Sequence, residues 1–356
     1  MQNLFGHLKV IDLSSVLAGP SVATFFAELG AHVIKYENST VGGDVTRSWK
    51  VKGENPASKT SAYWSSINYR KEIRLADLRD TSIQQEIYNL LESADVVITN
   101  FKEGDAAKFN LQESQLQSQF PHLIIASIYG YSSQPKRVAY DVVLQAETGF
   151  MYMNGEPQSP PTKMPVAMMD MLAAHQLKEG ILCALIQKNT TGKGCIVKSS
   201  LEKAGIAGLV NQASNYLMTG NVPQRLGSKH PNIAPYGEVF FTKDEKQVVL
   251  AVGSDKQFQQ LLKILQLPEL ANDTRFENNI SRVKNREQLE QILQEKLSAL
   301  HADEFISACI DHDVPAGKIK DLQEVFSSAP ANAMVLEEIY DGEKTLRVQS
   351  VAFEIY

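Results

Sequence analysis

The stretch LKVIDLSSVLAGPSVATFFAELGAHVIKYE, residues 8–37, holds two short apolar runs on either side of a helical pattern. LKVIDLS at 8–14 and AHVIKYE at 31–37 are rich in β-branched residues and predict two strands. SVATFFAELG between them predicts a helix, with Pro20 just before it and Gly30 at its end. Because the connection crosses over through a helix, the two strands are predicted to be parallel.

The same alternation continues along the next 180 residues. The sequence predicts strands at 73–78, 95–101, 122–130 and 194–200, and helices at 81–94, between about 140 and 188, and at 201–218. Strands that alternate with helices indicate an α/β fold with a doubly wound parallel sheet, whose ligands bind beyond the carboxyl ends of the strands. A large Rossmann-like domain is therefore expected.

The pattern changes after the turn-rich segment 221–235. YGEVFFT and QVVLAVG flank a turn and predict a hairpin, and three helical segments follow before residue 313. This predicts a smaller α+β domain. The predicted boundaries are 1–224 plus 331–356 for the large domain and 225–330 for the small one, with a terminal hairpin within 337–355.

Composition narrows the classes of protein that fit. The chain has 356 residues, of which 43% are hydrophobic and 21% charged, and its net charge is −6. An acidic chain without a lysine or arginine cluster argues against a nucleic-acid partner, and no apolar run approaches the roughly 20 residues of a membrane span. The N-terminus lacks the layout of a signal peptide, and three scattered cysteines and seven unclustered histidines indicate neither disulfides nor a metal site. We expect a cytoplasmic protein without a metal.

Two local features point to chemistry. VLAGP at 16–20 is a strand-to-helix turn of small residues that lets a ligand approach a helix N-terminus, but it lacks the glycine pattern of a dinucleotide site. An NAD-dependent oxidoreductase is therefore disfavoured. MPVAMMDMLAAHQLKEGILCAL at 164–185 places Asp170 among apolar residues, where it either caps a helix or has a functional role.

Taken together, the motifs resemble the family III CoA-transferases, the group of formyl-CoA and carnitine CoA-transferases. The resemblance runs in order from about residue 6 to residue 330. It is carried by the segment around Asp170 and by KVIDLSSVLAGPSVATFFAELGAHVIKYENSTVGGDVTRSW, NYRKEIRLADL, SADVVITNFKEG, YDVVLQAETGF, KNTTGKGCIVKSSL and HPNIAPYGEVFFTKDEKQVVLAVGSDKQF.

The resemblance implies that Asp170 is a nucleophile that forms an acyl anhydride and then an aspartyl-CoA thioester. Coenzyme A would be a substrate rather than a permanently bound cofactor, and the other partner a small carboxylic acid. It also implies an interlocked homodimer. The residues that it implies for the CoA site are Leu17, Ala18, Arg70, Lys71, Asn100, Phe101, Lys108, Arg137, Ala139 and Tyr140.

Two alternatives stay open. An α-methylacyl-CoA racemase has the same fold, but that subgroup uses a histidine just before the aspartate of the YD motif. Here Tyr140 precedes Asp141, and no histidine lies between His122 and His175. A CoA-binding protein without transferase activity is the second alternative. The sequence leaves the donor and the acceptor acid open.

Overall fold

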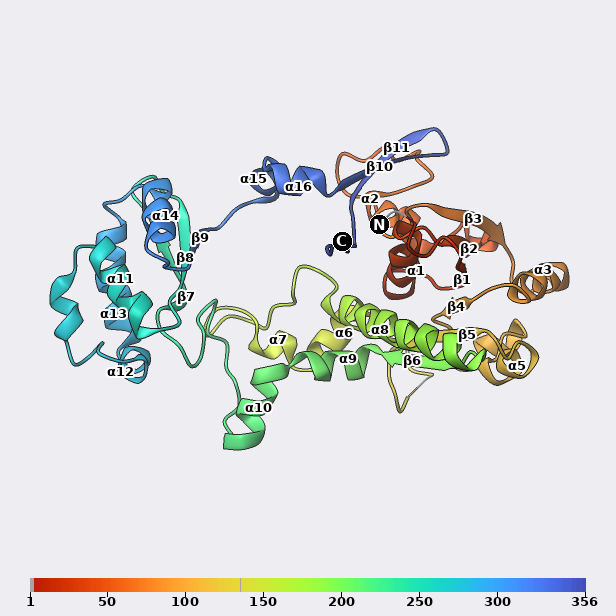
Figure 1. Ribbon diagram of the computed structural model, residues 1–356, viewed down its shortest axis with the longest axis horizontal. Helices are drawn as coiled ribbons and strands as arrows, with labels where there is room; N and C mark the ends of the chain where they lie inside the picture. Colours follow the sequence, from red (N-terminus) through yellow and green to blue (C-terminus); the bar gives the residue numbers. More distant parts are fainter. Residues whose placement is uncertain (1–2, 135) are drawn as a thin grey trace. The chain divides into compact units, whose positions relative to one another are not determined.

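A computed structural model describes residues 3–134 and 136–356 of the chain (Figure 1). By their contacts these residues divide into two compact units. The first runs to Phe150 and includes Lys163–Asn221 and Asn332–Tyr356, and the second consists of Met151–Thr162 and Val222–Ala331.

The first unit is built on a parallel sheet of six strands in the described residues, in the order β3-β2-β1-β4-β5-β6. The predicted doubly wound sheet is thus confirmed. Strands β2 and β3 lie on one side of β1, and β4, β5 and β6 lie on the other, so the order in which the chain adds strands reverses between β1 and β4. Ligands of such folds bind at this switch point. The strands are β1 (Lys9–Asp12), β2 (His32–Asn38), β3 (Lys71–Ala76), β4 (Val96–Thr99), β5 (Ile124–Tyr129) and β6 (Ile196–Ser200).

Consecutive residues of the central strand β1 belong to different hydrophobic cores. Val10 packs into a core with α1, α8 and α9, whereas Ile11 packs into another with α3 and α5. Successive side chains of a strand point to opposite faces, so a run of apolar residues buries both faces of the sheet. The helices of this unit are α1 (Ala18–Glu28), α2 (Ala62–Ser65), α3 (Thr81–Leu91), α4 (Asp105–Lys108), α5 (Glu113–Gln119), α6 (Asp141–Glu147), α8 (Met168–Thr191), α9 (Leu201–Gly208) and α10 (Val210–Thr219), while α7 (Phe150–Met153) spans the boundary between the units.

The C-terminal hairpin of the first unit is also as predicted. β10 (Val335–Tyr340) and β11 (Glu343–Val348) pair antiparallel, and the Arg347 guanidinium lies 2.5 Å from the Glu28 carboxylate on α1. The helix predicted at 201–218 is instead two helices, α9 and α10. They separate at Val210, whose φ of 44° lies in the left-handed region, which interrupts a regular helix.

The second unit has a small antiparallel sheet packed against helices. The predicted hairpin is confirmed as β7 (Tyr236–Phe241) and β8 (Gln247–Ala251), and a third strand that was not predicted, β9 (Ala316–Lys318), pairs with β8. β9 has only three residues, too few for a period-2 pattern. The helices are α11 (Asp255–Ile264), α12 (Asn279–Lys284), α13 (Arg286–Leu297), α14 (Ala302–Asp311) and α15 (Leu322–Phe326), and α16 (Ala329–Ala333) continues into the first unit.

The sequence assigned 151–162 to the large domain, whereas its contacts in the structure are with the second unit. Gly227 donates its backbone N–H to the Gly155 carbonyl at 2.9 Å, and Arg225 donates to the Tyr152 carbonyl at 2.9 Å. That the units are independently folding domains with the predicted boundaries stays a prediction. Among the described residues, no helix has the length and apolar character needed to cross a membrane.

Candidate active site

A small pocket of about 120 Å³ lies at the carboxyl ends of β1, β4 and β5, at the switch point of the sheet. Asp170 lines it, together with the turn that follows β1 and the segment that follows β4. Of the residues that the sequence predicted, the pocket brings together Leu17, Ala18, Asn100, Phe101, Arg137, Ala139, Tyr140 and Asp170. These residues come from segments up to about 150 positions apart, so the family resemblance grouped them but only the fold shows that they line one pocket.

Asp170 lies in the first turn of α8, in the third position of the helix. No hydrogen bond or ion pair to its carboxylate is found among the residues that the structure describes. Burial, and to a lesser degree the negative charge of Asp141, raises the pKa of Asp170 to about 7. A desolvated carboxylate of raised basicity is a stronger nucleophile than an exposed one, provided that the pH is high enough to ionise it.

Asp170 is not the cap of its helix. Ala167 is the N-cap residue of α8 and has no side-chain acceptor, so the cap comes from α6. One oxygen of Asp141 accepts the N–H of Met169 at 2.7 Å and that of Asp170 at 3.4 Å. The Asp141 side chain therefore satisfies donors of α8 that the helix itself leaves open, and the carboxylate of Asp170 stays available.

Gln145 fixes the segment that leads into α8. Its side-chain N–H groups donate to Asp141 at 2.5 Å and to the Val166 carbonyl at 3.3 Å, and its oxygen accepts the Met164 N–H at 2.7 Å. Asp141 and Gln145 together therefore hold the start of α8.

Tyr63 lies near the site, and the sequence analysis did not single it out. Burial, followed by the negative charges of Asp170, Asp141 and Asp44, raises the pKa of Tyr63 to about 12. Its ring packs edge-on against Trp49, with 5.1 Å between the centroids. Tyr63 lines neither pocket, and its raised pKa keeps the phenol protonated as a hydrogen-bond donor. The only signal in the sequence was the TRSW motif that contains Trp49, which is close in space to Tyr63 but 14 residues away.

A second pocket, of about 620 Å³, continues the first. The two share Ser15, Asn100, Phe101 and Lys102. Its wall includes Lys108, which was predicted for the CoA site, and also Arg79 and Lys102, which were not predicted. Lys108 is paired with Asp105 and Arg79 with Asp77, whereas Lys102 has no ion pair within the described part of the chain. The wall of the second pocket also holds the carboxylates of Glu37, Asp44, Asp77 and Asp105. The two pockets together form a continuous path that passes Lys102 and reaches Asp170.

Asn100 lines both pockets, but its amide group serves the turn after β1. The oxygen accepts the Ser15 N–H at 3.1 Å, and the nitrogen donates to the Ser15 carbonyl at 2.8 Å. The side chain therefore joins the end of β4 to the end of β1.

Two of the predicted residues lie outside both pockets. The Lys71 ammonium is buried and donates to Asp12 at 3.0 Å, to the Pro20 carbonyl at 2.8 Å and to Asn68 at 3.2 Å. An ammonium has three donors, so none is left for a phosphate of a ligand. This corrects the assignment of Lys71, and the site proposed below does not include it. The Arg70 guanidinium lies over the Tyr69 ring at 5.3 Å and also lines neither pocket.

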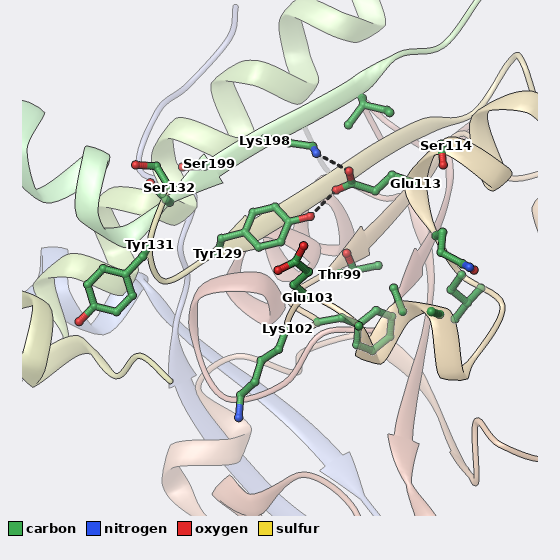
Figure 2. Close-up of a pocket in the computed structure, with 18 of the residues that line it drawn as sticks. Thr99, Lys102, Glu103, Glu113, Ser114, Tyr129, Tyr131, Ser132, Lys198 and Ser199 are labelled. Carbon is green, nitrogen blue, oxygen red and sulfur yellow. Dashed lines mark hydrogen bonds and ion pairs between the residues drawn. The ribbon is translucent and has the colours of Figure 1, made fainter. Parts of the chain in front are cut away.

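A third pocket, of about 670 Å³, adjoins these two at the ends of β4, β5 and β6 (Figure 2). Glu113 accepts a hydrogen bond from Tyr129 at 2.7 Å and lies 2.5 Å from the Lys198 ammonium, while the Lys102 side chain extends away from this group (Figure 2). These charges compensate one another, and Asp170 is not part of the wall. Within the described residues, no group of three or more histidine, cysteine, aspartate or glutamate side chains is placed to hold a metal ion.

Comparison with known proteins gives consistent matches. The family model described as CoA-transferase family III matches residues 6–355. A succinate–glutarate CoA-transferase of Agrobacterium fabrum is 36% identical, over 94% of this chain and 85% of the relative. The human succinyl-CoA:glutarate CoA-transferase is 32% identical, over 93% of this chain and 75% of the relative. The crystal structure of a CAIB/BAIF family protein from Brucella suis matches with a TM-score of 0.83 and 35% identity, covering 99% of this chain and 93% of that one. The matches therefore extend over both compact units.

Proposed function

Since this chain belongs to CoA-transferase family III and is an enzyme that moves CoA from an acyl-CoA to a carboxylic acid, we propose that Asp170 is its nucleophile and that short dicarboxylic acids are its substrates. The observation that carries the proposal is the Asp170 carboxylate itself. It lines the pocket at the switch point of the sheet, has no protein partner among the described residues, and has a pKa raised to about 7.

The chemistry follows from a carboxylate that meets a thioester. An Asp170 oxygen attacks the thioester carbonyl, the carbon–sulfur bond breaks, and CoA leaves as a thiolate, so that an anhydride joins Asp170 to the acyl group. The thiolate then attacks the aspartyl carbonyl, which releases the donor acid and leaves an aspartyl-CoA thioester. The acceptor carboxylate attacks the carbonyl of this thioester, the carbon–sulfur bond breaks, CoA leaves again as a thiolate, and a second anhydride forms. The thiolate attacks the acceptor carbonyl of that anhydride, which yields the new acyl-CoA and restores the Asp170 carboxylate.

Two observations support short dicarboxylic acids. By their names, the relatives from Agrobacterium fabrum and human act on succinate and glutarate. The pocket beside Asp170 has a volume of about 120 Å³, a small fraction of the 620 Å³ of the pocket that adjoins it. The space suits a short acyl chain rather than a fatty one.

The proposed substrate class predicts a preference among acceptors. With succinyl-CoA as donor, we expect glutarate to be converted to glutaryl-CoA with a kcat/KM at least about tenfold above that of acetate. A site that binds the second carboxylate of glutarate leaves its own polar groups unpaired when acetate binds. Mass spectrometry of the CoA esters measures the products. Equal transfer to acetate and glutarate would contradict the dicarboxylate assignment. Uptake of deuterium from solvent at the α-carbon of a 2-methylacyl-CoA, without any transfer, would instead indicate the racemase.

We place the phosphates of CoA in the 620 Å³ pocket, near Lys102 and Lys108, with Leu17, Ala18, Phe101, Arg137, Ala139 and Tyr140 along the path toward Asp170. CoA is then a substrate, and we propose no permanently bound cofactor, nucleic acid or membrane as a partner.

Lys102→Ala tests this placement. An exposed ammonium contributes about 1 kcal/mol to an ion pair, so the KM for succinyl-CoA is expected to rise roughly fivefold while kcat changes little. Steady-state kinetics at two salt concentrations measures the effect, which should weaken at high salt. Lys256→Ala, an exposed lysine on α11 of the second unit, is the matched control. A KM that is unchanged in Lys102→Ala would move the phosphates elsewhere.

We further propose that the enzyme is a homodimer and works in the cytoplasm. The exposed apolar side chains on and after α10, Val210, Leu217, Met218 and Val222, offer a surface for a second copy. Cys183, Cys195 and Cys309 are all free thiols, as is usual in a reducing compartment.

A further inference from the structure

The turn between β1 and α1, residues 14–18, contains a residue in an unfavourable conformation. Val16 has a φ of 70°. A β-branched residue is an outlier in this left-handed region, which glycine adopts freely. Such a conformation persists only where the surrounding structure enforces it, and such positions cluster at functional sites. This turn carries Leu17 and Ala18 into the pocket that Asp170 lines.

Side chains from four segments hold the backbone of this turn. Asp12 accepts the Ser14 N–H at 3.0 Å, and the buried Lys35 ammonium donates to the Ser14 carbonyl at 2.6 Å. Asn100 binds both backbone groups of Ser15, as described above. The Val16 N–H donates to the Oδ2 atom of Asp44 at 3.0 Å. Among the hydrogen bonds of the described residues, this one alone acts directly on Val16.

The backbone N–H of Asp44 and both oxygens of its carboxylate have partners within the protein. Its backbone N–H donates to Glu37 at 2.8 Å, and its Oδ1 atom accepts from the backbone and hydroxyl of Thr46 at 3.0 and 2.8 Å. Its Oδ2 atom lies 3.8 Å from the Lys35 ammonium, and both side chains are almost completely buried. A charged acceptor in a low-dielectric interior makes a strong hydrogen bond. Capping of the 3₁₀ turn Val45–Ser48 needs only Oδ1, so Oδ2 remains for Val16.

We propose that Asp44 is a positioning residue for CoA transfer, which acts through Val16. By accepting the Val16 N–H it keeps the turn in the left-handed conformation that presents Leu17 and Ala18 to the acyl thioester beside Asp170. The proposal rests on the proposed function, because it assigns the turn a role in the attack by Asp170.

Asp44→Asn breaks the contact to Val16 and also removes the negative charge that faces the Lys35 ammonium. The amide oxygen still accepts from Thr46, but its NH₂ group then faces the Val16 N–H, and two donors cannot bind each other. We expect the rate constant for labelling of Asp170 by succinyl-CoA to fall about tenfold, while the final amount of adduct per protein is unchanged. A merely structural loss would lower the amount of adduct. In the Val16→Gly background the same substitution should lower the rate constant less than about threefold, because glycine adopts the turn conformation without help.

Asp80→Asn is the matched control. Asp80 caps α3 with the same pattern, accepting from the backbone and hydroxyl of Ser82 at 2.8 Å each, but it is exposed and lines neither pocket of the site. The rate at which Asp170 is labelled in Asp80→Asn should match that of wild type. Hydrogen–deuterium exchange of the peptide that contains Val16 is the second readout, and exchange should be faster in Asp44→Asn than in wild type.

The adduct assay tests the proposed function and the positioning role of Asp44 separately. If wild type forms no adduct on Asp170 with succinyl-CoA or acetyl-CoA, the proposed function fails. If wild type is labelled but Asp44→Asn slows labelling equally with and without the Val16→Gly substitution, or not at all, the positioning role of Asp44 is overturned.

Discussion

Asp170→Asn is expected to lower the rate of CoA transfer by roughly 10⁴-fold or more, because an amide cannot form the anhydride on which both halves of the reaction depend. The initial rate of glutaryl-CoA formation measures the loss. Hydroxylamine added after succinyl-CoA should convert Asp170 to a hydroxamate in wild type, and peptide mass spectrometry should find none in the variant. A variant that keeps more than about 1% of the activity would exclude Asp170 as the nucleophile.

The same variant should be more stable than wild type, which separates a chemical loss from misfolding. The pKa of Asp170 is raised from 3.8 to about 7 in the folded protein, so the folded state holds a proton that the unfolded state has lost between these pH values. Wild type therefore loses stability as the pH rises through this window, and asparagine does not. We expect the stability gain of Asp170→Asn to be about 2 kcal/mol larger at pH 8 than at pH 5.

Urea unfolding of both proteins at the two pH values measures this difference. Glu179→Gln, an exposed acid farther along α8, is the control and should show no such gain. A gain for Asp170→Asn that does not change with pH would mean that the carboxylate is not desolvated in the folded protein.

Asp141→Ala is expected to lower the transfer rate roughly a hundredfold. Without the Asp141 carboxylate the first turn of α8, which carries Asp170, is no longer held in place, and a small displacement of a reacting group lowers the rate strongly. The variant removes the acceptor that holds the N–H groups of Met169 and Asp170 at 2.7 and 3.4 Å. The kcat for glutaryl-CoA formation should carry most of the loss, since the proposed CoA contacts come from other residues.

Asp141→Asn separates the charge of Asp141 from its role as a cap. Asparagine still offers an oxygen to the helix but removes the negative charge that raises the pKa of Asp170. The proposed attack needs Asp170 as a carboxylate, so the wild-type rate of its labelling should rise with pH to a plateau, with a midpoint at about 7. The midpoint should move to lower pH in Asp141→Asn and stay in place in Glu179→Gln. A midpoint unaffected by Asp141→Asn would show that burial alone sets the pKa.

The parallel sheet was predictable from the chain because its cause is local. The βαβ pattern of residues 8–37 needs only hydrophobic periods of about 2 and 3.6, a proline before the helix and a glycine after it. The motifs around Asp170 identified the family in the same way, as a linear pattern. The conformation of the turn after β1 could not be predicted from the sequence in this way. Nothing in the sequence marks Val16 as left-handed, since valine disfavours that conformation, and the structure enforces it through Asp44, 28 positions away.

The adjacent residues Arg70 and Lys71 show most clearly what the sequence could not predict. Arg70 and Lys71 were assigned together to the CoA site, but the register of β3 beside β2 turns Lys71 into the interior against Asp12, where its three donors are used. Asn100 and Asp141 line up with the family pattern, yet their side chains serve the backbone of Ser15 and the start of α8. The sequence alone determined the fold class and singled out the candidate nucleophile, because both depend on patterns along one segment. Only the tertiary structure decided which polar groups are free for a ligand, because a donor or acceptor is available only when no group from a distant segment has already bound it.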